Sequence, residues 1–472
     1  MENFIALPEA FTGNMKVLLG DEYSGFESSL HKVSPVSIRL NEGVKLPSAA
    51  GAGFPDFDFD FESSVPWCKS GVYLEKRPSF TLDPLFHSGS YYVQEAASMF
   101  LEQCVNTVKQ YENIDYILDL CAAPGGKSTH LISLFPDSLI VSNEVIRSRT
   151  SALDENIGKW GHANTMITSC DPAMFQKLNS FFDFILVDAP CSGEGMFRKE
   201  PEALKGWSPA NVKHCATRQL RIVRDVWDSL KPGGFMLYGT CTYNREENEN
   251  LIRFIVENLG AESIPVDISA FEGIAPSVDK NIHACRFFPH KTKSEGLFLS
   301  LIRKNGEPKQ NSTRKTKRFA KIPELNSWIQ QSEMVAYIRN NDRIYLLPEK
   351  FAADVEFIGK TVHTLSSGTE ICTVKGKELI PSLDFAHSTV INVSNFAVWE
   401  VDNATALKFL KKETLFAPPT NTGKGFVLIT YRGVPLGWVK NIGSRCNNIL
   451  PKSYLRFLIY DFRFLIYDFR LG

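Results

Sequence analysis

Two cysteines and one aspartate stand where a buried strand would end, and their types could support covalent chemistry. Asp188 and Cys191 follow the apolar run at residues 184–187, in a proline- and glycine-containing segment that can continue neither strand nor helix. Cys241 follows a second apolar run at residues 235–238. The carboxyl ends of neighbouring strands in an α/β sheet share one edge, so the three side chains are expected to face one cleft. Either cysteine alone would be interpreted as an unreactive residue of the core.

A turn of small residues precedes both cysteines. Residues 119–127 read Asp-Leu-Cys-Ala-Ala-Pro-Gly-Gly-Lys, after a short apolar run and before a helical pattern. Small residues let a ligand approach the backbone, and free N–H groups at a helix start can bind an anion such as a carboxylate. The segment matches neither the GxGxxG nor the P-loop pattern, which disfavours NAD and ATP. Lys127 opposes the helix dipole, and this mild penalty favours a functional role.

Two acidic residues follow the next two predicted strands. Glu144 lies 25 residues after Asp119, a distance at which an acid can accept hydrogen bonds from a ribose. Asp171, which precedes a proline, could face an adenine. Either acid alone is more often a cap or loop residue. Together with the small-residue turn they indicate an adenosine-containing cofactor without a pyrophosphate.

Two thiols beside a carboxylate and a lysine suit one demanding reaction, methylation at carbon 5 of a pyrimidine. Carbon 5 is a poor nucleophile until a thiolate adds to carbon 6 and turns the ring into an enamine. A base must afterwards remove the C5 proton so that the thiolate can leave. The sequence therefore predicts a two-cysteine mechanism.

Strands and helices are expected to alternate from residue 113 onward, which is typical of a doubly wound, mostly parallel α/β sheet. The strands are predicted at residues 116–120, 138–142, 165–168, 184–187, 235–238 and 296–302, and the helices at 95–111, after 126, and at 147–160, 211–230 and 246–258.

Composition is that of an ordinary globular chain. The 472 residues are 43% hydrophobic with a formal net charge of −1, so a nucleic-acid surface would have to be a local patch. No apolar run reaches the length of a membrane span, and no signal pattern opens the chain. Ten cysteines without CxxC pairs favour a reducing cytoplasm and disfavour both disulfides and a metal site. A cytoplasmic monomer is expected.

Four parts are predicted along the chain. An N-terminal α+β segment covers residues 1–112, the doubly wound core 113–303, a basic linker 304–321, and a β-rich module 322–472. Residues 303–321 hold eight Lys or Arg against one Glu, which is read as a linker. The heptapeptide at 457–463 recurs at 464–470, too short a unit for a structural repeat.

These motifs resemble the Sun-type RNA (cytosine-5) methyltransferases, in particular their bacterial RsmF-like ribosomal RNA branch. The resemblance covers nearly the whole chain. It implies a Rossmann-like class I methyltransferase core and a C-terminal PUA-like module acting on 16S ribosomal RNA or the small subunit. The Phe/Asp stretch at 56–61 and the duplicated tail depart from the family pattern. The matching stretches are 66–68, 91–95, 122–127, 188–199, 240–243, 247–249, 286–290 with Gly296, 437–440 and 445–451.

The resemblance also implies roles for single residues. Cys241 corresponds to the covalent nucleophile and Cys191 to the cysteine that resolves the adduct. Lys127 and Asp188 would contact the target cytosine. S-adenosylmethionine would be held by Cys121, Ala122, Ala123, Pro124, Gly125, Gly126, Lys127, Glu144, Asp171 and Asp188.

Two other readings compete with this one. In a DNA cytosine-5 methyltransferase the nucleophile would be Cys191, with a long target-recognition insert that the chain lacks. A non-catalytic RNA-binding or assembly factor would tolerate loss of either cysteine, yet both are present.

Overall fold

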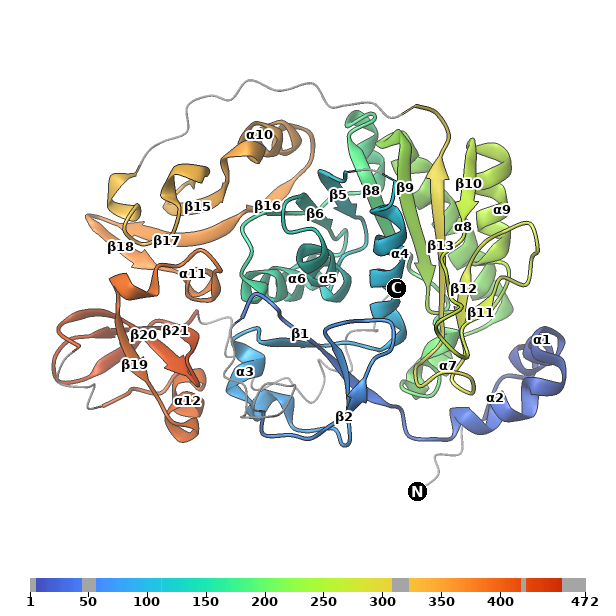
Figure 1. Ribbon diagram of the computed structural model, residues 1–472, viewed down its shortest axis with the longest axis horizontal. Coiled ribbons are helices and arrows are strands. Elements are labelled where there is room, and N and C mark those ends of the chain that lie inside the picture. Colours follow the sequence, from blue (N-terminus) through green and yellow to red (C-terminus); the bar gives the residue numbers. More distant parts are fainter. Residues whose placement is uncertain (1–5, 45–56, 112, 308–321, 417–421, 452–472) are drawn as a thin grey trace.

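A ten-stranded sheet runs through the middle of the chain in the computed structural model, which describes residues 6–44, 57–111, 113–307, 322–416 and 422–451 (Figure 1). Nine strands follow the order β11-β12-β13-β9-β8-β5-β6-β7-β16, and β10 pairs with β13. The strands are β5 (Tyr116–Asp119), β6 (Leu139–Asn143), β7 (Thr165–Thr168), β8 (Phe182–Asp188), β9 (Leu230–Thr240), β10 (Ala261–Ile264), β11 (Ala275–Pro276), β12 (Cys285–Phe287), β13 (Leu297–Lys304) and β16 (Thr364–Ser367).

Strand order creates a switch point between β5 and β8. From β5 the chain moves outward through β6 and β7, then returns to place β8 and β9 on the other side, all parallel. In a doubly wound sheet the loops diverge at such a point and leave a crevice at the carboxyl ends. Asp119 and Asp188 end these two strands, so both expected ligand-binding turns open onto the crevice.

Successive side chains of each central strand point to opposite faces of the sheet and pack in two separate cores. On β5, Ile117 packs with the apolar residues of α4, α5 and α6, whereas Leu118 packs with those of α8, α9 and α10. Both faces of the sheet are therefore covered, as expected for a parallel sheet. The helices are α4 (Leu101–Val108), α5 (Gly126–Leu134), α6 (Arg147–Trp160), α7 (Pro201–Gly206), α8 (Pro209–Trp227), α9 (Glu249–Asn258) and α10 (Ala352–Thr361).

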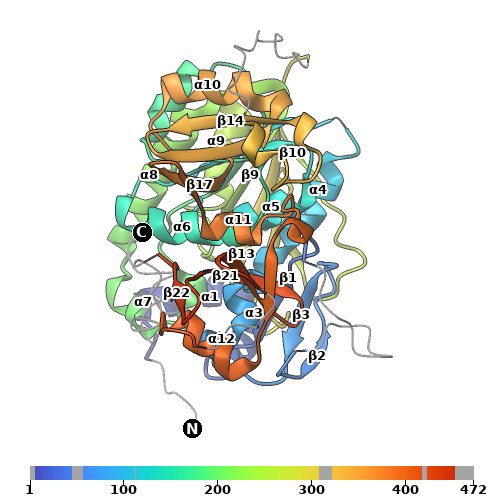
Figure 2. The same cartoon turned by 90° about the vertical axis from the view of Figure 1, so that its left-hand side faces the viewer.

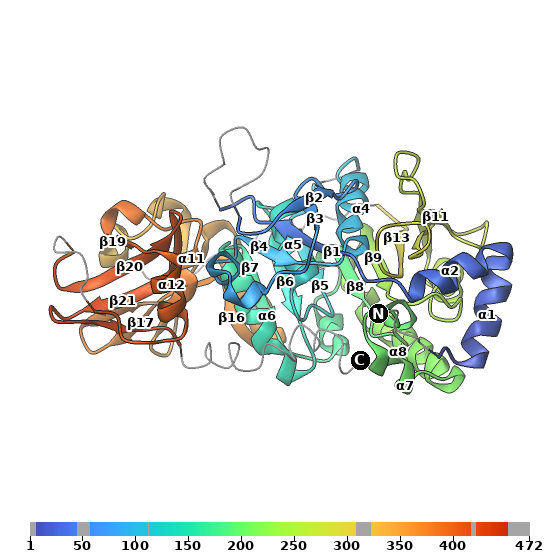
Figure 3. The same ribbon diagram turned by 90° about the horizontal axis from the view of Figure 1, so that it is seen from below.

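The N-terminal part is a small antiparallel sheet preceded by two helices. Its strand order is β2-β3-β1-β4, and Figure 3 shows helices α1 and α2 at the end of the long axis opposite the C-terminal part. Its elements are α1 (Glu9–Leu19), α2 (Tyr23–Leu30), β1 (Val36–Leu40), β2 (Phe61–Ser64), β3 (Gly71–Leu74), α3 (Pro84–His87) and β4 (Tyr91–Val93).

The C-terminal part contributes two four-stranded sheets, which face the viewer in Figure 2. One has the order β14-β15-β17-β18, and the other the order β19-β20-β21-β22. Their elements are β14 (Val335–Asn340), β15 (Arg343–Pro348), β17 (Thr369–Lys375), β18 (Glu378–Pro381), α11 (Leu383–His387), β19 (Ala397–Glu400), α12 (Asn403–Leu410), β20 (Gly425–Tyr431), β21 (Val434–Asn441) and β22 (Cys446–Asn448).

The C-terminal part is tied to the rest of the molecule at two places. Strand β16 pairs antiparallel with β7 and so extends the core sheet. Apolar residues of β1, β3 and β4 share one cluster with residues of α12, β20 and β21. The unit predicted after residue 322 is thus continuous with both the core sheet and the N-terminal sheet.

The predicted alternation of strands and helices is confirmed, and α6 and β7 have the predicted bounds. Two local expectations were wrong. Residues 97–100 form a 3-10 helix ahead of α4 where an α-helix was predicted, and residues 231–234 lie inside β9, which was predicted to begin at residue 235. Most of the basic linker and the duplicated heptapeptide lie outside the described residues. Within the described ranges, no helix has the length and apolar character needed to cross a membrane.

Candidate active site

A cavity of about 930 Å³ opens at the switch point of the sheet. The turn after β5 and the loop after β8 line it, and Cys241 reaches it from the end of β9. Residues 92–95 of the N-terminal part and 295–297 before β13 complete the wall. All four residues predicted to take part in catalysis therefore line one cavity, namely Lys127, Asp188, Cys191 and Cys241.

Lys127 and Asp188 form a close ion pair in this cavity. The Lys127 Nζ atom lies 2.6 Å from Asp188 Oδ2. Burial works against the charged ammonium, but the Asp188 carboxylate outweighs that cost, and the pKa of Lys127 is raised. Lys127 is therefore a permanent cation at neutral pH, with its charge directed into the cavity.

The two cysteine sulfurs are neighbours. Sγ of Cys191 lies 3.1 Å from Sγ of Cys241, which permits a hydrogen bond between the thiols. This hydrogen bond, followed by burial, raises the pKa of Cys191 well above its usual range. Cys191 therefore carries its thiol proton at neutral pH, and either sulfur can be the donor in this contact.

Glu194 holds the two cysteine loops together. Its buried carboxylate accepts hydrogen bonds from the Thr242 hydroxyl (2.6 Å) and from the backbone N–H groups of Tyr243 (2.8 Å) and Asn244 (2.9 Å). The Trp207 indole N–H (3.0 Å) and the Asn244 amide (3.1 Å) donate to its other oxygen. A residue three positions after Cys191 therefore organises the segment that follows Cys241.

Glu247 makes the reciprocal connection. This residue follows Cys241 in the chain, and its carboxylate accepts hydrogen bonds from the Ser192 backbone N–H at 3.0 Å and from the Gln219 side chain at 2.7 Å. Burial raises the pKa of Glu247. Sequence reasoning missed both glutamates as site residues, because an acid in a polar loop looks the same whether it is solvated or buried.

The turn after β5 is shaped for a ligand that lies against its backbone. Cys121, Ala122, Ala123, Pro124 and Gly126 all line the cavity. A Cβ on Gly126 would lie 3.0 Å from the Tyr92 ring. Gly125 has a φ of +112°, in the left-handed region that favours glycine.

The carboxylates of Glu144 and Asp171 differ in burial and in hydrogen-bond partners. Glu144 is buried, and its Oε2 accepts no hydrogen bond from the described residues, although Arg149 Nη1 lies 3.5 Å away. Asp171 is 45% exposed, caps the backbone N–H of Ala173 and pairs with Arg221 at 3.4 Å. Neither residue is part of the cavity lining, so the structure does not bring this predicted pair together with the cysteines.

Asp119 is a buried carboxyl beneath the same turn. The Ser128 hydroxyl donates to its Oδ2 at 2.6 Å, and its Oδ1 has no partner among the described residues. Burial raises the pKa of Asp119 to about 7. No pattern in the sequence indicates that this strand-end acid is shielded from solvent.

Three family models match the chain. The model described as "16S rRNA methyltransferase RsmB/F" matches residues 106–303. The N-terminal domain of 16S rRNA methyltransferase RsmF matches residues 7–96, and the methyltransferase RsmF PUA domain matches residues 396–456.

Relatives extend these matches over almost the whole chain. The ribosomal RNA small subunit methyltransferase F of Cronobacter sakazakii is 30% identical, over 96% of this chain and 97% of its own. That of Shewanella piezotolerans is 29% identical over 90% of each chain.

Solved structures share the fold of the core. A methyltransferase homologue from Pyrococcus horikoshii is 28% identical with a TM-score of 0.52, over 63% of this chain and 95% of its own. The NSun6 structure from the same organism has a TM-score of 0.54 at 20% identity, over 65% of this chain and 100% of its own, and shows the fold alone.

Proposed function

Because this chain belongs to the RsmB/F family of 16S ribosomal RNA methyltransferases, we propose that it methylates carbon 5 of a cytosine in 16S ribosomal RNA. In this proposal S-adenosylmethionine is the methyl donor, Cys241 is the covalent nucleophile and Cys191 resolves the adduct. The observation that carries the proposal is the 3.1 Å separation of the two sulfurs in the cavity that also holds the Lys127–Asp188 pair.

The residues around the turn fit an adenosine-containing methyl donor. Glu144 Oε2 accepts no hydrogen bond from the described residues and is an acceptor for ribose hydroxyls, and the turn at 121–127 leaves its backbone open to the donor's carboxylate. Asp171 is the proposed contact at the adenine edge. When bound, S-adenosylmethionine supplies a methyl group on a positively charged sulfur that leaves as a neutral thioether.

Cys241 begins the proposed reaction. Its thiolate adds to C6, forming the S–C6 bond, and the electron pair of the C5–C6 double bond moves into the ring so that C5 becomes nucleophilic. The Lys127 ammonium can donate a hydrogen bond to O2, and Asp188 can accept one from the amino edge of the ring. Preorganised charges of this kind stabilise the developing anion much as an oxyanion hole does.

Cys191 acts after methyl transfer. Carbon 5 then carries a proton and a methyl group, and the enzyme is still bonded to the RNA. The Cys191 thiol first gives its own proton to water, and the resulting thiolate, a strong base because its pKa is raised, then takes the C5 proton and becomes a thiol again. A water held by Cys191 would serve in the same place. Removal of that proton restores the C5–C6 double bond and expels the Cys241 thiolate.

The RNA is proposed to contact the N-terminal part, the basic linker and the C-terminal module, with the chain acting as a monomer. A base inside a helix cannot reach the cavity, so the target cytosine should be unpaired or flipped out. Affinity should fall with salt through counterion release.

Bisulfite sequencing of 16S ribosomal RNA from cells with and without the gene tests the proposal. One or a few protected cytosines should disappear when the gene is deleted, and 23S ribosomal RNA should be unchanged. The purified chain should restore the signal on naked 16S RNA or on small subunits, which identifies its substrate. An unchanged cytosine pattern, or methylation of another base, would contradict the proposal.

A further inference from the structure

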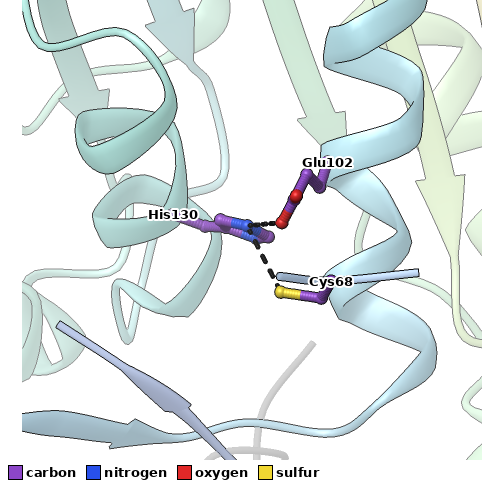
Figure 4. A group of neighbouring side chains, drawn as sticks. All are labelled: Cys68, Glu102 and His130. Atoms are coloured by element: carbon purple, nitrogen blue, oxygen red, sulfur yellow. Dashed lines mark hydrogen bonds and ion pairs between the residues drawn. The ribbon is translucent and has the colours of Figure 1, made fainter. Parts of the chain in front are cut away.

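Three side chains that the proposed methylation chemistry does not use lie close together near α5, the helix that follows the turn at residues 119–127. Cys68 lies in the turn between β2 and β3, Glu102 on α4 and His130 on α5 (Figure 4). Cys68 is 3% exposed and His130 1%, while the Glu102 side chain is 13% exposed. One ligand atom from each residue lies within 4.8 Å of the other two.

Hydrogen bonding accounts poorly for this convergence. His130 Nε2 lies 3.5 Å from Glu102 Oε2 and 3.9 Å from Cys68 Sγ. The first distance is long for a hydrogen bond, and a neutral ring carries at most one proton on that nitrogen.

The separations match those of a metal coordination shell. Zinc binds cysteine sulfur at about 2.3 Å, histidine nitrogen at about 2.0 Å and carboxylate oxygen at about 2.1 Å, in tetrahedral geometry. That geometry puts neighbouring ligand atoms roughly 3.3–3.6 Å apart. The observed 3.5 Å and 3.9 Å to His130 need only small adjustments, and the separation between Cys68 and Glu102, which is within 4.8 Å, would have to shorten by at most about 1.2 Å. The Ser70 hydroxyl, 3.9 Å from the Cys68 sulfur, offers a further oxygen, and water could occupy a fourth position.

We propose that Cys68, Glu102 and His130 form a structural site for a thiophilic divalent cation of the zinc class. A thiolate and a carboxylate would balance its two positive charges. Sequence patterns indicated no metal because the three ligands are separated by 34 and 28 residues, outside the short spacings that mark zinc motifs. The site forms only when the N-terminal sheet packs on the core.

The site would fix α5, the helix that begins at the end of the turn at residues 119–127. His130 lies one turn after Lys127 on α5, and Arg39 of the N-terminal sheet donates to the Thr129 hydroxyl between them at 2.6 Å. A cation that joins α5 to α4 and to Cys68 would therefore hold the start of α5 in place. This inference depends on packing and does not require any particular methylation target.

Metal content of the purified full-length protein tests the proposal. A chain with Cys191→Ser and Cys241→Ser serves as background, because two adjacent thiols could also bind zinc. After incubation with Zn²⁺ and removal of excess, one zinc per chain is expected by elemental analysis. Substitution by Co²⁺ should give the visible and near-ultraviolet absorption of a tetrahedral site with a thiolate ligand.

Three variants in that background locate the metal. Cys68→Ser and His130→Asn should lose stoichiometric zinc, and zinc should no longer raise their melting temperature. Cys104→Ala is the matched control, a buried cysteine on the same helix as Glu102 but outside the cluster, and it should retain both effects. If these ligand variants do not fold, the milder Glu102→Gln replaces them, and it should bind zinc more weakly than the background protein does. No zinc in the background protein, or equal binding by all variants, would overturn the proposal.

Discussion

Sγ of Cys191 and Sγ of Cys241 lie 3.1 Å apart although 50 residues separate them in the chain. The two residues follow β8 and β9, which are parallel neighbours in register from Phe184 to Asp188. Glu194 and Glu247 then tie each cysteine loop to the other through buried hydrogen bonds. The sheet therefore brings the thiols to one edge, and the carboxylates set their final separation.

Single cysteine variants should separate the two roles. Cys241→Ala should lower methylation by at least about 10³-fold and form no covalent RNA adduct, because the nucleophile is lost. Cys191→Ala should methylate once and accumulate an adduct that survives a denaturing gel, because the C5 proton is not removed. The opposite pattern would make Cys191 the nucleophile, as in the DNA enzymes. Unchanged methylation in both variants would rule out covalent catalysis.

Glu194→Gln tests whether the buried carboxylate positions the cysteines. The amide NH₂ of glutamine would face donors that now bond to an oxygen, so we expect a loss of roughly 1–3 kcal/mol in the free energy of unfolding. Methylation should fall while S-adenosylmethionine affinity, measured by calorimetry, stays unchanged. Glu356→Gln is the control, since Glu356 pairs with Lys360 on α10 and does not line the cavity. Equal activity of the two variants would show that Glu194 does not position the site.

Calorimetry can rank the two acids proposed to hold the methyl donor. Glu144→Ala should weaken S-adenosylmethionine binding by roughly 1–3 kcal/mol, because a buried acceptor is lost. Asp171→Ala should weaken it by less than about 1 kcal/mol, because this carboxylate is 45% exposed and already engaged by Ala173 and Arg221. A larger effect at Asp171, or binding of NAD with equal affinity, would contradict the assignment.

Much of the catalytic core could be predicted from local patterns. The apolar run at 184–187 lies within β8, and the turn at 119–127 opens α5 as expected. Four apolar residues are too few for a typical helix, and the proline and glycine that follow them favour a buried strand. The convergence of Cys191 and Cys241 followed from strand adjacency alone.

Other features depend on contacts between distant segments. Strand β16 has the polar sequence Thr-Leu-Ser-Ser and becomes a strand only because β7 offers an unpaired edge. Phe57 and Phe59 pack on the cluster shared with the C-terminal part, and the alternation of Phe and Asp does not by itself indicate that contact. The cluster of Cys68, Glu102 and His130 likewise depends on three elements that are far apart in the sequence.

Asp119 should make stability depend on pH. Its pKa is about 7 in the folded protein, because of burial, against about 3.9 in an unfolded chain. Unfolding therefore releases a proton between these values, and the free energy of unfolding should fall as pH rises through that window. Asp119→Asn removes this slope, at most about 1.4 kcal/mol per pH unit, so its stability relative to wild type should rise from pH 5 to 7. Asp137→Asn, an exposed control, should follow wild type. Parallel profiles for Asp119→Asn and wild type in urea unfolding would contradict the burial argument.

Truncations should show that the region after residue 322 is two units with different attachments. A chain ending at residue 307 loses β16 and α10, so β7 becomes a free edge and the core cluster loses Val355 and Ile358. A chain ending at residue 395 keeps both elements and loses residues 396–472, which include the segment matched by the PUA model. Hydrogen exchange of β7 amides should accelerate in the first chain and stay slow in the second. Exchange in β1 should accelerate in both, because each lacks the residues 401–450 that pack on Ile38, and this provides the internal control. Equal protection of β7 in the two chains would mean that the core sheet is complete without β16.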